Sequence, residues 1–410
     1  MSLITSISGI RGTIGGHPGD ALTPIDIVKF TAAYARQLQG RAGKGRRCKV
    51  VVGRDARISG PMVEKLVTGT LMACGIDVVD AGLASTPTTE MAVVFEKADG
   101  GIILTASHNP KEWNALKLLD SKGEFLSDED GRRVVAAASS GDFDFAGVTS
   151  LGSVESKDFT AAHVEAVCNY HLVDVPSIKA AGFKVVLDSI NSVGGIAMPS
   201  LFKALGVECI VINGTSYGNF AHNPEPLPAN LKDLSAAVVR EKADLGVSVD
   251  PDVDRLAFIC ENGEPFGEEY TLVSVADYVL STAKGVAVSN LSSSRALKDV
   301  AQSHGCTYMF SKVGEKNVST LMQETSAVIG GEGNGGVIVP DLHYGRDAMI
   351  GVALFLSNLA HKKMNVSALK ATYPQYHIAK NKIELSDKGM IDRILAEVKS
   401  AYAGERINEI

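Results

Sequence analysis

The chain has 410 residues, of which 45% are hydrophobic and 21% are charged, and its formal net charge is −7. This balance is typical of a globular protein with several cores, because one core rarely serves more than about 250–300 residues. The charges form no basic block, so we expect no nucleic acid or anionic membrane as a partner, and no protein partner is implied. The sequence shows neither a signal peptide nor a long apolar run, and its six cysteines are widely spaced. We therefore expect a cytoplasmic protein with reduced thiols.

Three stretches of the chain share one pattern, in which a β-branched run is followed by a polar loop, a helical pattern, a glycine and a second apolar run. The stretches begin at Lys49, Lys184 and Gly285. The glycines that would end the three helices in a left-handed conformation are Gly75, Gly206 and Gly305. A short return from a helix predicts a parallel strand and a right-handed crossover. We therefore expect a fold of three consecutive, similar α/β domains with mixed, helix-covered sheets.

We expect the domain boundaries in the polar stretches between these units. The three predicted domains cover residues 1–154, 155–257 and 258–368. The remaining residues, 369–410, begin with a predicted strand over 376–385 and continue with a predicted helix over 388–403. Because about forty residues rarely form an independent core, we expect this part to be the start of a fourth α+β domain.

A serine follows the apolar run GIIL, where a buried strand is expected to leave its sheet. Ligands of open α/β sheets gather at such strand ends, so Ser107 is a candidate nucleophile. An ordinary turn is the alternative, because Asn109 before Pro110 favours a turn on its own. A Ser-His hydrolase is not indicated, since the sequence has no G-x-S-x-G elbow and His108 is only a neighbour in sequence.

Three aspartates, Asp250, Asp252 and Asp254, follow the apolar run DLGVSV. Alternate residues of an extended chain share a face, so we expect their carboxylates to meet at one place and to bind a hard cation. Oxygen ligands favour Mg²⁺ or Ca²⁺ over Zn²⁺. A solvated acidic turn is the alternative. An EF-hand is excluded because its sixth position needs glycine and here is Arg255, and a haloacid-type phosphatase with Asp250 as nucleophile matches only in part.

A glycine-rich segment, GGEGNGG, covers residues 330–336. It contains a formal G-x-G-x-x-G, but the VIVP that follows predicts a strand, whereas a dinucleotide-binding loop needs a helix there. Glu332 and Asn334 in this loop can bind ligand hydroxyls. A tight hairpin is an equally good interpretation.

These segments, in this order, resemble the α-D-phosphohexomutase superfamily, which includes phosphoglucomutase, phosphomannomutase and phosphoglucosamine mutase. The motifs are SGIRGT at 8–13, TASHNPKEWNALK at 105–117, DPDVDR at 250–255, KVGE at 312–315 and GEGNGG at 331–336. The resemblance covers nearly the whole chain. It implies a Mg²⁺-dependent isomerase that interconverts hexose 6-phosphate and hexose 1-phosphate through a phosphoserine and a hexose bisphosphate intermediate.

The resemblance also implies roles for individual residues. The catalytic residues would be Ser107 as phosphoryl carrier, His108, Lys117 as a candidate for moving a proton, Arg11 and Arg255. The metal ligands would be a phosphate oxygen on Ser107 together with Asp250, Asp252 and Asp254. The substrate-binding residues would be Lys312 and Gly314, which sense the orientation of the sugar, and Glu332 and Asn334, which hold its hydroxyls.

The sequence departs from the family pattern at some positions, which leaves the hexose open. Asn334 and Gly336 replace the usual serine and histidine of the sugar loop, and Pro251 and Val253 replace glycines of bacterial phosphoglucosamine mutases. Phosphoglucosamine mutase is the first choice, with phosphomannomutase or phosphoglucomutase as the alternative. The phosphate clamp of the family's fourth domain does not occur before residue 410, so we expect slow turnover. A metal-dependent sugar phosphatase and a non-catalytic sugar-phosphate-binding protein are the remoter alternatives.

Overall fold

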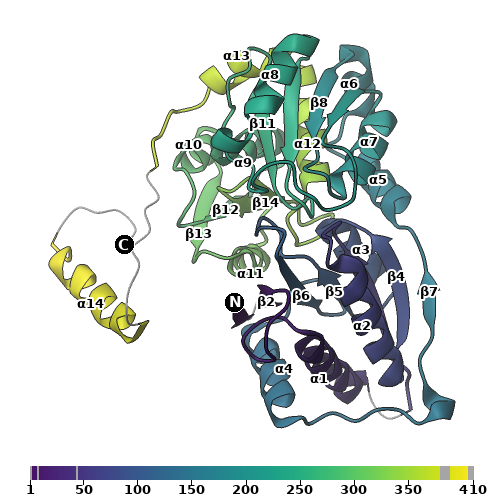
Figure 1. Ribbon diagram of the computed structural model, residues 1–410. Helices are drawn as coiled ribbons and strands as arrows, with labels where there is room; N and C mark the ends of the chain where they lie inside the picture. The colour runs from purple at the N-terminus through teal and green to yellow at the C-terminus, as the bar shows by residue number, and fades with distance from the viewer. Residues whose placement is uncertain (1, 7–8, 43–44, 379–387, 405–410) are drawn as a thin grey trace. The chain divides into compact units, whose positions relative to one another are not determined.

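The computed structural model describes residues 2–6, 9–42, 45–378 and 388–404 of the chain (Figure 1). Residues 1–374 form one compact unit, which contains three sheets, each covered by helices. Residues 375–410 form a second unit, whose described elements are η3 (Lys388–Met390) and α14 (Ile391–Ala401). None of the described helices is long and apolar enough to cross a bilayer.

The first sheet has seven strands in the order β1-β2-β6-β5-β3-β4-β7, with β5, β3, β4 and β7 parallel and the remaining pairs antiparallel. Its strands are β1 (Leu3–Ser6), β2 (Gly9–Thr13), β3 (Lys49–Arg54), β4 (Asp77–Leu83), β5 (Gly100–Leu104), β6 (Trp113–Leu119) and β7 (Val154–Ser156). Its helices are α1 (Pro24–Ala42), α2 (Gly60–Ala73), α3 (Thr86–Phe95) and α4 (Asp128–Ser140), followed by η1 (Val148–Ser150). In β3, Val50 and Val52 pack with α1, α2 and α4, whereas Val51 packs with α3. Alternate side chains of the strand therefore contribute to a core on each face of the sheet.

The second sheet has the order β11-β10-β8-β9, and only the β10–β11 pair is antiparallel. Its strands are β8 (Lys184–Asp188), β9 (Glu208–Ile212), β10 (Leu245–Val249) and β11 (Leu256–Cys260). The helices of this part are α5 (Thr160–Asn169), α6 (Val175–Ala181), α7 (Gly194–Leu205) and α8 (Lys232–Glu241), with η2 (Pro228–Asn230) before α8.

The third sheet has the order β13-β12-β14-β15, and only the β14–β15 pair is antiparallel. Its strands are β12 (Val286–Asn290), β13 (Thr307–Ser311), β14 (Ile329–Glu332) and β15 (Gly336–Ile338). The helices are α9 (Glu268–Thr282), α10 (Ala296–Ser303), α11 (Glu315–Thr325), α12 (Ala348–Lys362) and α13 (Val366–Ala371).

The three repeated units form as expected, which confirms the three-part α/β fold. They are β3-α2-β4, β8-α7-β9 and β12-α10-β13, and the two strands of each unit pair in parallel. The helix-ending glycines have positive φ angles of 78°, 68° and 69° at Gly75, Gly206 and Gly305. The backbone there takes the left-handed conformation that glycine adopts without steric cost.

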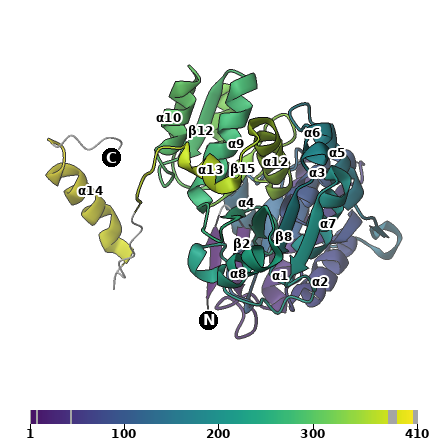
Figure 2. The same cartoon turned by 90° about the horizontal axis from the view of Figure 1, so that it is seen from above.

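Helix α12 joins the second and third parts in one core. Every residue from Ala348 to Leu359 is buried, as expected of a helix that is apolar all round. It contacts α9 on one side and α5, α6 and α7 on the other, and Figures 1 and 2 show it among these helices. The two parts are therefore held together by apolar burial.

The expected boundaries at 154/155, 257/258 and 368/369 each fall inside an element. The first falls in β7, which pairs with β4, and the second falls in β11, which pairs with β10. The third falls in α13. Composition did not show that residues 154–155 and 257–258 lie inside strands, because the pairing of an edge strand is a tertiary contact. The predicted helix over 388–403 is present as η3 and α14, whereas most of the predicted strand over 376–385 lies outside the described residues.

Candidate active site

Ser107 lies in the turn that leaves β5 and is 7% exposed. Its φ angle is 49°, in the left-handed region, which costs a residue other than glycine about 1–2 kcal/mol. The backbone N–H of Ser107 donates to Thr105 Oγ1 at 2.9 Å, and Thr105 Oγ1 donates to Asp55 Oδ2 at 2.7 Å. The surrounding contacts therefore hold the serine in a conformation that it would not adopt alone.

Arg57 is the main support of this turn. Its guanidinium is completely buried and forms an ion pair with Asp55, with 2.9 Å between Arg57 Nε and Asp55 Oδ2. It also donates to four carbonyl oxygens of the serine loop, those of Ser107, Asn109 (2.7 Å), Pro110 (2.7 Å) and Trp113 (3.0 Å). One cation thus fixes the path of the loop from the serine to the start of β6.

Asp250, Asp252 and Asp254 are fully buried and converge, but not for the reason expected from the sequence. The segment between β10 and β11 is a turn in which Val253 has a φ angle of 62°, so the prediction of an extended chain with alternating faces was wrong. The turn still brings one oxygen of each carboxylate within 4.8 Å of the others. Backbone amides stabilise it, since the N–H groups of Asp254 and Arg255 donate to Asp250 Oδ1 at 3.2 and 3.1 Å.

This acidic cluster fits a hard divalent cation. Asp252 Oδ2 accepts from Lys117 Nζ at 2.8 Å and from Thr86 Oγ1 at 2.7 Å. Among the described residues, Oδ1 of Asp252 and Oδ1 of Asp254 are buried without a hydrogen-bond partner. Burying a carboxylate oxygen costs free energy unless the oxygen accepts a hydrogen bond or coordinates a metal. Ser107 Oγ adjoins the cluster and donates to Asp250 Oδ2 at 2.8 Å.

A cavity of about 490 Å³ opens over the serine. The expected site residues that line it are Arg11, Ser107, His108, Lys117, Arg255, Gly314, Glu332 and Asn334. Lys312 does not line it and is exposed, although residues 313–317 do. The three aspartates lie outside the lining, so Ser107 separates the cavity from the acidic cluster.

The glycine-rich segment forms the hairpin between β14 and β15, which confirms the hairpin interpretation, whereas hydroxyl binding by Glu332 and Asn334 stays a prediction. Glu332 Oε1 accepts from Asn290 Nδ2 at 2.7 Å and from the Gly314 amide at 3.3 Å. Gly335 has a φ angle of 88°, and a Cβ there would lie 2.3 Å from the carbonyl oxygen of Leu256. The hairpin therefore packs directly on the strand that follows the acidic turn, which glycine alone permits.

Family models match three consecutive parts of the chain. They describe α/β/α domains I, II and III of phosphoglucomutase/phosphomannomutase and match residues 3–144, 161–263 and 267–376. A phosphoglucomutase/phosphomannomutase of Thermococcus kodakarensis is 37% identical over 396 residues, which are 95% of this chain and 86% of the relative. The chain belongs to the α-D-phosphohexomutase superfamily.

Other phosphohexomutases are similar over most of their length. A phosphoglucosamine/phosphogalactosamine mutase of Sulfurisphaera tokodaii is 30% identical over 100% of this chain and 89% of its own. The crystal structure of a phosphoglucomutase/phosphomannomutase family protein from Burkholderia thailandensis has a TM-score of 0.78 at 28% identity, covering 91% of this chain and 80% of that one. These comparisons confirm the resemblance inferred from the motifs.

The charges of this candidate site shift the pKa values of its groups. Burial, together with the neighbouring carboxylates of Asp254 and Asp252, raises the pKa of Asp250 well above its usual range. Burial alone would also raise the pKa of Asp252, but the Lys117 ammonium outweighs it and holds that pKa below its usual range. Burial would lower the pKa of Lys117, yet the aspartates raise it, so this lysine stays protonated. Burial and Arg255 lower the pKa of His108 to about 3, so its imidazole is neutral.

Three supporting residues were missed by the sequence analysis. They are Arg57, Thr86 and Arg346, none of which was expected at the site. Arg57 had a usable signal, since it lies in the DAR that directly follows β3, whose carboxyl end lies beside that of β5 in the parallel sheet. Arg346 had none, because it lies in a loop before α12 and reaches the site only through the tertiary fold.

Proposed function

We propose that this chain is a phosphohexomutase that interconverts hexose 6-phosphate and hexose 1-phosphate, with Ser107 as the carrier of the phosphoryl group. The observation that carries the proposal is the place of Ser107 Oγ, which lines the cavity and also donates to Asp250 Oδ2 at 2.8 Å. The hydroxyl thus adjoins both the space for a sugar and the acidic cluster. The names of the relatives in the same family support this reaction.

Asp250, Asp252 and Asp254 would hold Mg²⁺ together with a phosphate oxygen on Ser107. When bound there, the cation neutralises charge on the phosphoryl group, which is what phosphoryl transfer needs most. The protein holds two of these ligands in place, since Thr86 and Lys117 bind Asp252, and Arg346 Nη2 donates to Asp254 Oδ2 at 2.7 Å.

In the proposed reaction the bond between phosphorus and Ser107 Oγ breaks as a bond to a free hydroxyl oxygen of the sugar forms. The resulting hexose bisphosphate turns over in the cavity, and its other phosphoryl group returns to the serine. The cationic side chains Arg11, Lys117 and Arg255 line this space and suit two phosphates. Because Lys117 is protonated, it would give a proton to the serine oxygen that loses the phosphoryl group, and the proton released by the attacking sugar hydroxyl would restore its ammonium.

Among hexoses we place phosphoglucosamine first, with the phosphates of mannose and glucose as the alternative. Relatives carry both kinds of name. Besides Glu332, two acidic residues line the cavity, Asp128 and Glu315, and a carboxylate suits the ammonium group at C2 of glucosamine. Glu332 and Asn334 can bind hydroxyls that all three sugars share, so they would not discriminate among them.

The position of Asp250 favours this reaction over a sugar phosphatase in which Asp250 takes the phosphoryl group. Asp250 is 0% exposed and does not line the cavity. Its Oδ2 accepts from Ser107, its Oδ1 accepts from two backbone amides, and the residue does not reach the cavity in which a sugar phosphate would bind. Ser107 is the nucleophile that a sugar phosphate can reach.

The test is phosphosite mapping of the full chain after incubation with isotopically labelled hexose bisphosphate, together with coupled assays on glucosamine, glucose and mannose 1-phosphates. Label on Ser107 and formation of hexose 6-phosphate are expected. Label on Asp250 would establish the phosphatase, and binding without turnover would establish a non-catalytic protein. Equal kcat/KM on glucose and glucosamine 1-phosphates would refute the narrower substrate but keep the reaction class.

A further inference from the structure

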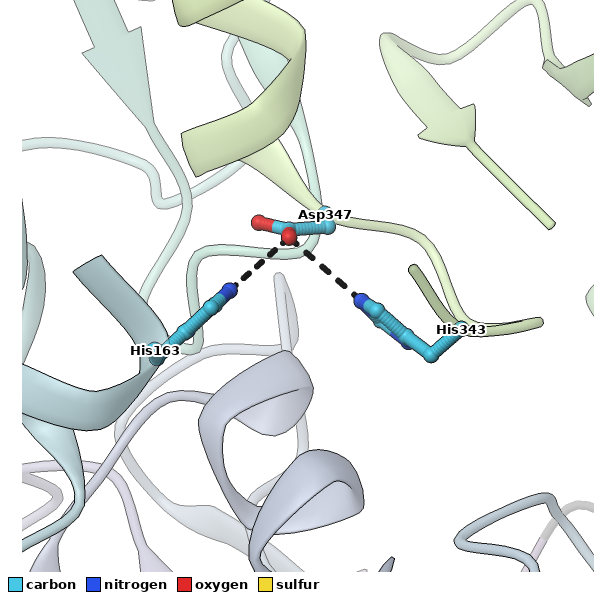
Figure 3. Close-up of side chains that lie close together, drawn as sticks. All are labelled: His163, His343 and Asp347. Atoms are coloured by element: carbon cyan, nitrogen blue, oxygen red, sulfur yellow. Dashed lines mark hydrogen bonds and ion pairs between the residues drawn. The ribbon is translucent and has the colours of Figure 1, made fainter. Parts of the chain in front are cut away.

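A second group of metal-ligating side chains lies apart from the acidic cluster. It consists of His163 on α5 and of His343 and Asp347 in the segment between β15 and α12 (Figure 3). Asp347 Oδ2 lies 3.0 Å from His163 Nε2 and 3.4 Å from His343 Nε2. His163 and Asp347 are 0% exposed, so water does not solvate these groups.

Both imidazoles direct Nε2 at the same carboxylate oxygen, as Figure 3 shows. The other ring nitrogens have partners on α3, since His163 Nδ1 lies 2.9 Å from Thr88 Oγ1 and His343 Nδ1 lies 3.2 Å from Glu90 Oε2. Histidines that bind metals have this arrangement, in which one nitrogen faces the ion and the other donates to a carboxylate or another acceptor.

Glu90 provides a second, independent observation. Its carboxylate is 2% exposed, and apart from the 3.2 Å contact between Oε2 and His343 Nδ1, neither oxygen has a hydrogen-bond partner among the described residues. A buried carboxylate needs nearby positive charge. With Asp347 it gives the group two buried anions, and the two imidazoles that contact these anions can offset them only when they are protonated. The group as a whole is therefore short of positive charge unless it binds protons or a cation.

We propose that His163, His343 and Asp347 bind a zinc ion. Two imidazole nitrogens and one carboxylate oxygen favour Zn²⁺ over the Mg²⁺ expected at an all-oxygen site. Ligands about 2.0–2.1 Å from a tetrahedral ion lie roughly 3.3–3.4 Å from each other. Asp347 Oδ2 already lies 3.0 and 3.4 Å from the two Nε2 atoms, and all three ligand atoms lie within 4.8 Å of one another, so the two imidazoles would move closer together on binding. Thr88 and Glu90 would fix the ring orientations, and water would complete the coordination.

The zinc ion would stabilise segments that support the active site, without itself lying in the cavity. Asp347 directly follows Arg346, which binds Asp254, and α3 carries both Glu90 and Thr86, which binds Asp252. The ion and its neighbours would thereby connect helices of the first and second parts with the loop of the third. The role is structural, since none of the three proposed ligands lines the cavity.

The competing arrangement has protons in place of the ion. The Gly345 amide lies 3.1 Å from His343 Nδ1, and a nitrogen that accepts from it would leave Nε2 protonated toward Asp347. The metal-bound form instead needs Nδ1 to donate to Glu90. The two arrangements can therefore be distinguished. Only the metal-bound form binds a divalent ion, and its affinity for that ion should depend on Glu90.

The experiment titrates the full chain with Co²⁺ in a large excess of Mg²⁺, so that Mg²⁺ competes for the three aspartates. We expect one equivalent of Co²⁺ with the intense visible absorption of four-coordinate cobalt, displaced by one equivalent of Zn²⁺. His343→Gln and Asp347→Asn should lose this signal, and Glu90→Gln should weaken binding about 10–100-fold. His304→Gln is the matched control, because His304 pairs with Asp277 at 2.7 Å outside this group and should leave the signal unchanged.

Asp347→Asn keeps the shape of the side chain, and an asparagine can also cap α12 where Asp347 Oδ1 accepts from the Met349 amide, so this variant should fold. Circular dichroism checks the fold of each variant. The proposal is overturned if the wild-type chain binds no four-coordinate Co²⁺, or if folded Asp347→Asn retains the full signal.

Discussion

Arg346 Nη2 donates to Asp254 Oδ2 at 2.7 Å, which connects the loop before α12 to the acidic cluster. The same guanidinium donates from Nη1 to Glu332 Oε2 at 2.9 Å and from Nε to Glu315 Oε2 at 3.1 Å. Arg346 is 7% exposed, so these ion pairs are largely shielded from water. One residue thus couples the proposed metal ligands to the proposed sugar-binding hairpin.

Arg346→Lys should lower kcat/KM about 10–100-fold and raise the Mg²⁺ concentration needed for half-maximal rate. A lysine keeps the charge, but its single nitrogen cannot reach the three carboxylates that three separate guanidinium nitrogens contact, so Asp254 and Glu332 lose their common support. Steady-state rates over a Mg²⁺ series measure both effects. Arg240→Lys, at an exposed pair with Glu241, is the control. Unchanged Mg²⁺ dependence in Arg346→Lys would show that the coupling is not functional.

Ser107→Ala should abolish hexose phosphate interconversion and remove phosphate from the protein, while the fold stays intact. The substitution deletes only the hydroxyl that is proposed to carry the phosphoryl group, and Arg57 still holds the loop by its carbonyl oxygens. Intact mass spectrometry and a coupled assay measure the two losses. Ser139→Ala, on the exposed face of α4, is the control. Near-normal turnover by Ser107→Ala is the result that rules out a phosphoserine mechanism.

Asp252→Asn should lower kcat at least about a hundredfold, which corresponds to about 2.7 kcal/mol of activation free energy. The change removes one anionic ligand and leaves the buried Lys117 ammonium without its 2.8 Å partner. Chelation of divalent ions should reduce wild-type activity in the same way. Full activity of the wild-type chain after thorough chelation would indicate a structural acidic turn.

Arg57→Lys should lower both stability and activity, because a lysine cannot bind four carbonyl oxygens and Asp55 together. Loss of a buried ion-pair partner costs about 3–5 kcal/mol, and retention of the charge should keep the cost below that range. Urea unfolding measures the stability, and kcat on the remaining folded protein measures the effect on Ser107. A variant with wild-type stability would mean that the loop holds its conformation without this cation.

Asp277 gives a prediction for stability against pH. Burial would raise its pKa, but Lys362 and His304 outweigh burial and hold that pKa below the ordinary value of 3.8. A lowered pKa in the folded state stabilises the protein above pH 3.8, and this contribution disappears as the pH falls through the folded value. Asp277→Asn should therefore cost about 0.5–1.5 kcal/mol at neutral pH and progressively less below pH 4. Thermal unfolding from pH 7 to 3 measures it, and a difference that grows toward acid pH would contradict the assignment.

Local patterns in the sequence determined the repeated units and the positions of the chemical groups. Apolar runs, helical periodicity and a following glycine predicted β3-α2-β4 and its two counterparts, because these features depend on residues close in the chain. Ser107 and the three aspartates were likewise recognisable because they follow predicted strands, where α/β sheets bind ligands, and Glu332 was recognisable within its glycine-rich segment.

The tertiary structure alone decided how these groups are held and what else lies together. Arg346 meets Asp254 across 92 positions of sequence, and His163 meets Asp347 across 184. The aspartates converge through a turn with Val253 in the left-handed region, which the alternation of an extended chain did not suggest. Pairings at such separations depend on how three sheets pack around shared cores, and hydrophobic periodicity reports only which face of an element is buried, not which partner buries it.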